Sequence, residues 1–149
     1  MKDMKNKILS LLMLGLMVFS GMAGLSINVH AAESNPNVAD TRFSFDNRNT
    51  SANGAIRRKY NNSKVYVYPT AGPQIRYQVY GCKSEKGASA SYQSNIVTIP
   101  MGTQGSITNK VNENGYTYAF IKFSRNSIAY VTTSGWWSPD STKNYVIFN

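Results

Sequence analysis

The sequence predicts an all-β protein, an immunoglobulin-like β-sandwich of about seven to eight antiparallel strands over residues 42–149. The first observation behind this prediction is that leucine is absent after residue 25. From Ala32 onward the chain has eight valines, eight isoleucines, ten tyrosines, five phenylalanines and both tryptophans. β-Branched and aromatic residues suit pleated sheets, and chains without leucine form poor helices. The second observation is that turn residues recur about every 8–12 positions, which is typical of a sandwich or small barrel.

The first strand and the segment after it follow from alternation and composition. Arg42–Asp46 places Phe43 and Phe45 on one face, as a strand with one buried face requires. Residues 47–63 are rich in Asn, Ser and Gly and contain the densest run of positive charge, Arg57-Arg58-Lys59. This composition predicts a long loop, and long loops are commonly either functional or mobile.

Two strands and a turn follow this loop. Lys64–Pro69 has apolar groups on both faces, and Thr70–Pro73 has the composition of a turn. In Gln74–Cys82 the residues alternate along the segment, which predicts a strand with one buried face. A polar connection, Lys83–Ser91, leads out of this pair.

The second half of the chain contains five further expected strands. They are Asn95–Pro100, Gly105–Val111, Tyr116–Ser124, Ser127–Ser134 and Asn144–Asn149. The Asn114-Gly115 pair tolerates positive φ and is the strongest hairpin signal in the chain. Arg125-Asn126 is expected to form another tight turn. Tyr116–Ser124 is the longest hydrophobic run, so we expect it to be central in its sheet.

The N-terminal residues have the composition of a cleaved signal peptide. Three lysines precede an apolar stretch that ends near Leu25, and Val29-His30-Ala31 has the small-x-small pattern of a signal peptidase site. We expect a signal peptide over residues 1–31, a flexible leader over 32–41 and an extracellular protein. The alternative is that the apolar stretch stays in place as a membrane anchor. After cleavage we expect no stable membrane insertion.

The expected exported chain is basic. After Ala31 it contains 13 Lys and Arg residues against 6 Asp and Glu residues, a net charge of +7. Such a charge draws a protein to anionic surfaces, and the same charge can equally serve solubility alone. The partners that we expect are an anionic wall polymer, an acidic lipid or a glycan. We expect no nucleic acid partner, and the oligomeric state is open.

The chemistry of catalysis is poorly represented in the exported chain. The only histidine, His30, lies in the expected signal peptide, and this side chain is the usual proton carrier and metal ligand near neutral pH. The six acidic residues share no short motif. Cys82 stands alone, so it cannot form an intramolecular disulfide, and it has no histidine to activate it. We therefore predict no enzymatic activity, no cofactor and no metal site.

Two groups of residues are candidates for ligand binding. The first is Arg57, Arg58 and Lys59 with Tyr60, because arginine forks bind phosphate or carboxylate and a nearby ring can stack on a flat ligand. The second is the doublet Trp136-Trp137. If this segment is extended, neighbouring side chains point to opposite faces, so one ring enters the core and the other faces outward. The structural alternatives are that the basic stretch is a solvated loop and that both tryptophan rings cap the open end of the sandwich.

The chain also resembles a known family. The stretches that carry the resemblance are DTRFSFD, NGAIRRKYNNSKVYVYPTAGP, MGTQGSITNKVNENGYTYAFIKF and SGWWSPDS, and the most specific parts are ENGYTYAFIKF and SGWWSPDS. They are similar to an uncharacterised family of small secreted proteins from Gram-positive bacteria, filed as a domain of unknown function. This resemblance implies a secreted single-domain protein and supplies no functional residues. A weaker, motif-free likeness is to lactococcin-type bacteriocins.

These observations favour a secreted, non-enzymatic β-sandwich that binds an anionic or carbohydrate component of the cell envelope. The alternative function is a bacteriocin-like secreted toxin. Two other hypotheses stay open: an extracellular hydrolase, if two of the acidic residues meet in one cleft, and a matrix subunit that is bridged through Cys82.

Overall fold

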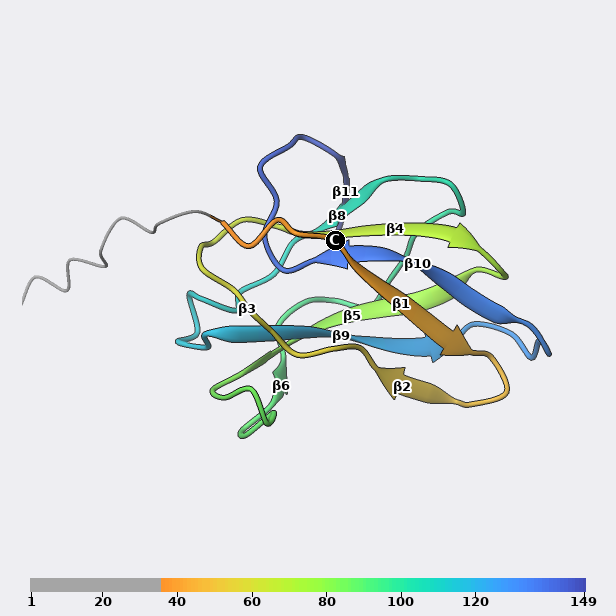
Figure 1. The fold of residues 1–149 in the computed structure, drawn as a ribbon, viewed down its shortest axis with the longest axis horizontal. Coiled ribbons are helices and arrows are strands. Elements are labelled where there is room, and N and C mark those ends of the chain that lie inside the picture. The colour runs from red at the N-terminus through yellow and green to blue at the C-terminus, as the bar shows by residue number, and fades with distance from the viewer. Residues whose placement is uncertain (1–35) are drawn as a thin grey trace, which may run out of the picture. The chain divides into compact units, whose positions relative to one another are not determined.

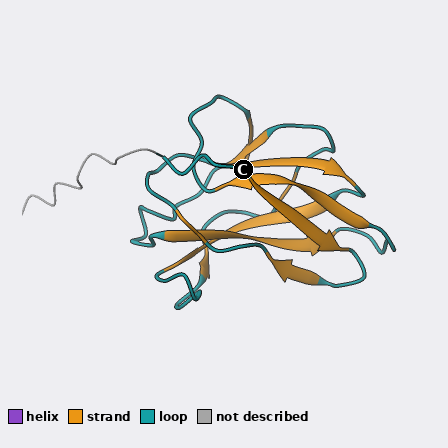
Figure 2. Cartoon of the chain, viewed as in Figure 1, coloured by secondary structure: helices purple, strands orange, loops and turns teal. Residues whose placement is uncertain are grey.

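The computed structural model describes residues 36–149. The predicted signal peptide and residues 32–35 of the predicted leader lie outside this range. Every regular element within it is a strand, and no helix occurs there (Figure 2). The prediction of an all-β protein is confirmed. Residues 36–149 contain no helix long and apolar enough to cross a bilayer.

The strands form two sheets (Figure 1). The first sheet has the order β1 (Thr41–Asp46), β10 (Thr132–Ser138), β4 (Val65–Ala71), β8 (Gly105–Ile107) and β11 (Val146–Phe148). The second sheet has the order β2 (Ser51–Asn53), β9 (Tyr118–Arg125), β5 (Ile75–Cys82) and β6 (Ser91–Tyr92), with β3 (Arg57–Arg58) on β9 and β7 (Val97–Thr98) on β5. The expectation that the longest hydrophobic run is central is confirmed, since β9 has neighbours on both sides.

The number and direction of the strands differ from the prediction. The described residues contain eleven strands instead of seven to eight, and β8 and β11 pair in parallel. The extra strands are only two or three residues long, and β2 and β3 lie in the polar segment that we expected to be a loop. β2 and β3 pair through their backbones with the side of β9 that faces away from β5, and such pairing needs no apolar side chains, so composition does not reveal it.

The hairpin expected at Asn114-Gly115 is also wrong in part. The turn forms, with Gly115 at a positive φ of 74°. However, β8 pairs with β4 and β11 in the first sheet, whereas β9 belongs to the second. The turn therefore carries the chain from one sheet to the other. The strand expected at Ser127–Ser134 forms later in the chain. It is β10, which begins only at Thr132 and continues through both tryptophans.

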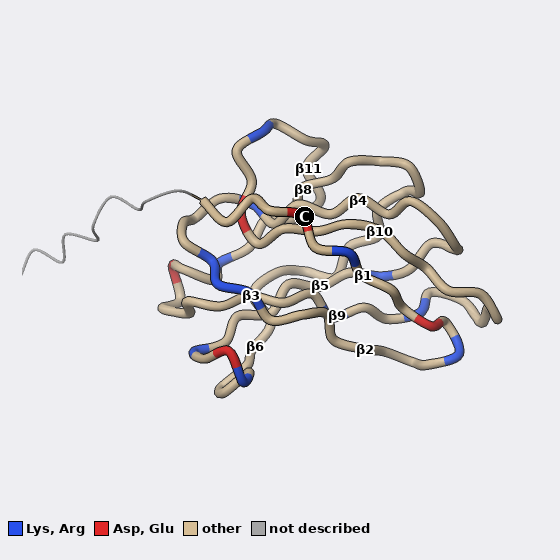
Figure 3. Tube along the Cα trace, in the orientation of Figure 1, with Lys and Arg blue, Asp and Glu red and all other residues tan. Residues whose placement is uncertain are grey.

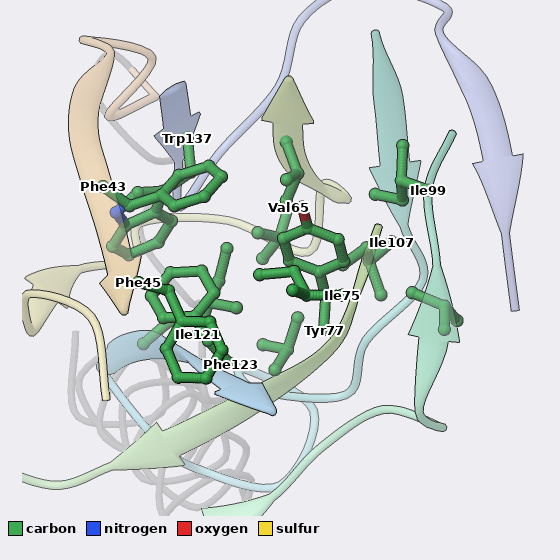
Figure 4. Close-up of a cluster of buried hydrophobic side chains, with 14 of the residues drawn as sticks. Phe43, Phe45, Val65, Ile75, Tyr77, Ile99, Ile107, Ile121, Phe123 and Trp137 are labelled. Carbon is green, nitrogen blue, oxygen red and sulfur yellow. The ribbon is translucent and has the colours of Figure 1, made fainter. Parts of the chain in front are cut away.

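The core lies between the two sheets and is rich in aromatic rings (Figure 4). Phe43 from the first sheet stacks on Phe123 from the second, with ring centroids 4.8 Å apart. Tyr77 meets both rings edge-on at 6.0 Å. Trp137 is fully buried beside them. The inward residues of β1, β4 and β10 thus form one wall of the core and those of β5 and β9 the other.

Candidate functional site

The tryptophan doublet is divided between the core and the surface. Both residues lie in the extended strand β10, where successive side chains point to opposite faces. Trp137 has no exposed surface, whereas 41% of Trp136 is exposed on the outer face of the first sheet. The predicted division is confirmed, and Trp136 is the ring that solvent reaches.

The exposed tryptophan has a neighbour on each side in the sheet. Trp136 is directly opposite Arg42 of β1 and directly opposite Tyr68 of β4. Residues directly opposite each other in antiparallel strands point to the same face, with Cβ atoms about 4.5–5.5 Å apart. Arg42 is exposed and Tyr68 is half-buried. We call these three residues the Trp136 row. It places a guanidinium, an indole and a phenol side by side.

A shallow hollow of about 180 Å³ lies beside this row. Tyr66 and Ser138, the next outward pair along β4 and β10, form part of its wall. The ring of Tyr145 packs on that of Tyr66, with centroids 4.6 Å apart. Burial and the nearby Asp40 carboxylate raise the pKa of Tyr66 to about 12. The remaining lining residues are Val38, Asp40, Asp140, Ser141, Thr142 and Lys143.

The basic stretch does not form a free loop. The guanidinium of Arg57 lies 5.7 Å from the centroid of the Trp137 ring and donates to Asn37 Oδ1 at 2.7 Å and to the carbonyl oxygen of Ala39. Partial burial lowers the pKa of Arg57. Arg58 is exposed, and its guanidinium lies 5.2 Å from the centroid of the Tyr60 ring. The structure therefore brings the two predicted groups together through Arg57 and Trp137.

Lys59 is buried and forms an ion pair with Asp140. Its Nζ donates to Asp140 Oδ1 at 3.0 Å and to the carbonyl oxygens of Ser63 and Pro139 at 2.6 and 2.7 Å. Asp140 Oδ2 accepts from the backbone N–H groups of Asn37 and Tyr60 at 2.8 and 3.0 Å. Both side chains of the pair have no exposed surface. Lys59 and Trp137 therefore offer no surface to a ligand, whereas Arg58 and Trp136 are exposed and Arg57 and Tyr60 are half-buried.

The same contacts hold part of the predicted leader to the domain. Asn37 binds Asp140 through its backbone and both Arg57 and Arg58 through its side chain, while Ala39 accepts from Arg57. The stretch before β1 is thus tied to the domain from Asn37 onward.

Comparison with known families identifies the chain. The family described as "Protein of unknown function (DUF2712)" matches residues 28–141. The chain belongs to this family. The matched range contains the Trp136 row, the Lys59–Asp140 pair and every strand except β11, and the resemblance to an uncharacterised family is confirmed. No curated protein and no solved structure matches the chain significantly.

The acidic residues of this DUF2712 domain differ in their partners. Asp40 and Asp140 line the same hollow, but Asp140 is ion-paired with Lys59 and accepts hydrogen bonds from two backbone N–H groups. Asp46 forms an ion pair with Arg48 at 2.6 Å, and this partner lowers the pKa of Asp46. In residues 36–149 no group of three or more His, Cys, Asp or Glu residues is placed to hold a metal ion. Cys82 is buried, and burial raises the pKa of its thiol.

A second, larger hollow was not predicted from the sequence. It has a volume of about 400 Å³, and side-chain amides form much of its lining. Tyr92 stands exposed at its rim, but Asn114 and Gln93 already bind each other at 2.6 Å. One lysine lines each hollow, Lys143 and Lys110, and the other Lys and Arg residues are distributed around the domain (Figure 3), so charge does not distinguish the two hollows. The Trp136 row is therefore the better defined candidate.

Proposed function

We propose that this protein is a secreted, non-enzymatic β-sandwich of immunoglobulin-like architecture that binds an anionic or carbohydrate component of the cell envelope. The contact surface is the Trp136 row on the outer face of the first sheet. The observation that carries the proposal is the exposed indole of Trp136, which stands in register between Arg42 and Tyr68.

The three side chains of the row match the chemistry of such a ligand. An exposed indole offers a flat apolar face with a polar edge, which suits stacking on a sugar ring. The Arg42 guanidinium can bind a phosphate or carboxylate with two parallel hydrogen bonds. The Tyr68 hydroxyl can donate or accept a hydrogen bond. A polyanionic glycan presents all three kinds of partner.

Supporting observations come from the rest of the chain. The N-terminal signal-peptide pattern and the positive charge favour export and an anionic target. Two stacked sheets around one core favour the immunoglobulin-like comparison. The ion-paired Asp140 leaves Asp40 without a second available carboxylate in its hollow, which favours binding over hydrolysis.

The proposal is tested by retention of the processed form, residues 32–149, on washed cell walls across a salt series. We expect Trp136→Ala to weaken retention about fivefold or more, since stacking of a flat ligand on one ring is worth about 1–3 kcal/mol. Arg42→Gln should weaken retention mainly at low salt, because salt screens its charge. Tyr92→Ala, which removes an exposed tyrosine from the second sheet, is the matched control.

Three outcomes contradict the proposal. Unchanged retention of the Trp136→Ala variant would remove the row as the contact surface. A loss in Tyr92→Ala as large as the loss in Trp136→Ala would place the contact at the amide-lined hollow instead. Absence of retention of the wild-type domain at low salt would remove wall binding altogether.

A further inference from the structure

The connection between β9 and β10 exposes an unusual concentration of apolar side chains. Within residues 126–131, which we call the Ile128 loop, the exposed fractions are 72% for Ile128, 84% for Tyr130 and 58% for Val131. Loops in contact with water are normally polar, and adjacent exposed apolar groups mark an interaction site. None of the three belongs to the hydrophobic core. Packing within the domain therefore does not explain them.

The base of the Ile128 loop is fixed although its tip is exposed. Asn47 Nδ2 donates to the carbonyl oxygen of Val131 at 2.7 Å and to Thr133 Oγ1 at 2.9 Å. Thr133 Oγ1 in turn donates to the carbonyl oxygen of Pro73 at 2.7 Å. The turn after β1, the turn after β4 and the Ile128 loop thus meet at one end of the domain (Figure 1). A loop whose base is already held by hydrogen bonds loses little conformational entropy when its tip binds.

Positive charge borders the apolar tip. Arg125 immediately precedes the loop, and Arg76 on β5 is directly opposite Ser124 of β9. Arg48 lies on the turn after β1, which contacts the loop through Asn47, and it is ion-paired with Asp46, the last residue of β1. The Arg125 and Arg76 residues therefore lie at the end of the second sheet from which the loop leaves.

We propose that the Ile128 loop inserts into the interface of an anionic lipid bilayer. The side chains of Ile128 and Val131 enter the boundary between headgroups and acyl chains. Tyr130 lies at the level of the headgroups, where amphipathic rings are enriched. Arg125 and Arg76 contact the lipid phosphates. The insertion is interfacial and reversible and does not span the bilayer.

A lipid surface fits this feature better than a protein partner. A stable protein interface needs about 800 Å² from each partner, arranged as an apolar centre with a polar rim. Three side chains on a projecting tip provide much less. A bilayer needs only a few apolar groups that reach below a layer of phosphates, with cations above them. The contact is also separate from the Trp136 row, which lies on the outer face of the first sheet.

Insertion is tested with the processed form and unilamellar vesicles of phosphatidylcholine, with or without phosphatidylglycerol. In the Ser127→Cys variant, an environment-sensitive fluorophore on the new thiol reports the polarity at the tip, because the native Cys82 is buried. We expect a blue shift and an intensity increase with phosphatidylglycerol vesicles. The same probe at Lys86→Cys, on an exposed connection far along the chain, should show neither change.

The partition coefficient identifies the residues responsible. We expect Ile128→Ser/Tyr130→Ser to lower it tenfold or more, since each buried apolar side chain contributes about 1.5–3 kcal/mol. Val146→Ser/Ile147→Ser is the matched control, because it removes two similarly exposed apolar residues from β11. Arg125→Gln should reduce the preference for phosphatidylglycerol over phosphatidylcholine.

Three results would overturn the proposal. They are vesicle binding without a fluorescence change at the tip, equal losses in the loop variant and the β11 control, and no binding to either vesicle. The Trp136→Ala variant should bind vesicles like the wild type. Failure of vesicle insertion is therefore distinguishable from failure of wall binding by the Trp136 row.

Discussion

The buried Lys59–Asp140 pair provides the most direct test of how this domain is held together. We expect Lys59→Met to lower the free energy of unfolding by about 3 kcal/mol, the lower end of the cost of breaking a buried ion pair. The lower end applies because Asp140 keeps the backbone N–H groups of Asn37 and Tyr60 as donors. The carbonyl oxygen of Ser63 still accepts a hydrogen bond from the side-chain amide of Asn109, at 3.2 Å.

Removing the other partner should cost more. Asp140→Ala removes the carboxylate that pairs with the buried Lys59 ammonium, and it removes the acceptor of two backbone N–H groups. We expect a loss of about 5 kcal/mol. For a domain of this size, each single variant should lower Tm by an amount within the range of roughly 10–20 °C. The double variant Lys59→Met/Asp140→Leu should cost less than the sum of the single losses, because no buried charge is left unpaired.

The assay is urea unfolding of the processed form, followed by tryptophan fluorescence. The Arg57 guanidinium contacts the Trp137 ring and Lys59 lies two residues later, so local loosening should register in the same signal. Hydrogen exchange at residues 37–40 adds a local readout, since Asp140 holds this stretch through Asn37. A Lys59→Met variant within about 1 kcal/mol of the wild type would refute the reasoning. So would single losses that add up in the double variant.

Three further predictions concern packing, pH and the thiol. Gly135→Ala should lower the free energy of unfolding by several kcal/mol in a urea titration, because a Cβ there would overlap the carbonyl oxygen of Tyr68 and lie 2.8 Å from the Phe43 ring; wild-type stability would contradict this. Tyr66, with a folded pKa of about 12 against about 10 when unfolded, stabilises the domain below about pH 10, and this contribution is lost as the pH rises to about 12. Tyr66→Phe should therefore flatten the alkaline loss measured by unfolding at a series of pH values, and an unchanged pH profile would count against it. Cys82 should react with a thiol reagent much faster in urea than in the native protein, and a disulfide-linked dimer on non-reducing electrophoresis would contradict its burial.

Local patterns in the sequence predict the class of the fold and the division of the doublet. The absence of leucine and the wealth of branched and aromatic residues indicate strands without knowledge of their partners. The opposite orientations of Trp136 and Trp137 follow from the geometry of any extended segment. Both inferences concern neighbours along the chain, and both hold in the structure.

What the sequence does not predict depends on distant partners. Lys59 is part of the densest basic run and would ordinarily be solvated, yet Asp140, 81 residues later, neutralises it in the interior. The strands β2 and β3 arise where a polar segment pairs with the side of β9 that faces away from β5. The Trp136 row exists only because β1 and β4 flank β10 in one particular register. A shift of one residue would turn every side chain of β10 to the other face.

The two tryptophans have different roles that depend on each other. Trp137 is fully buried, and the Arg57 guanidinium covers its ring, so this part of β10 has little freedom to rotate. Asp140, three residues later, is held by Lys59 and by two backbone N–H groups. The exposed ring of Trp136 is thus presented on a strand that is fixed at its core face and at its end. Binding through a ring that is already oriented avoids most of the entropy cost of ordering a side chain. In the proposed function, the basic stretch would therefore act indirectly, by holding in place the strand that carries the exposed indole.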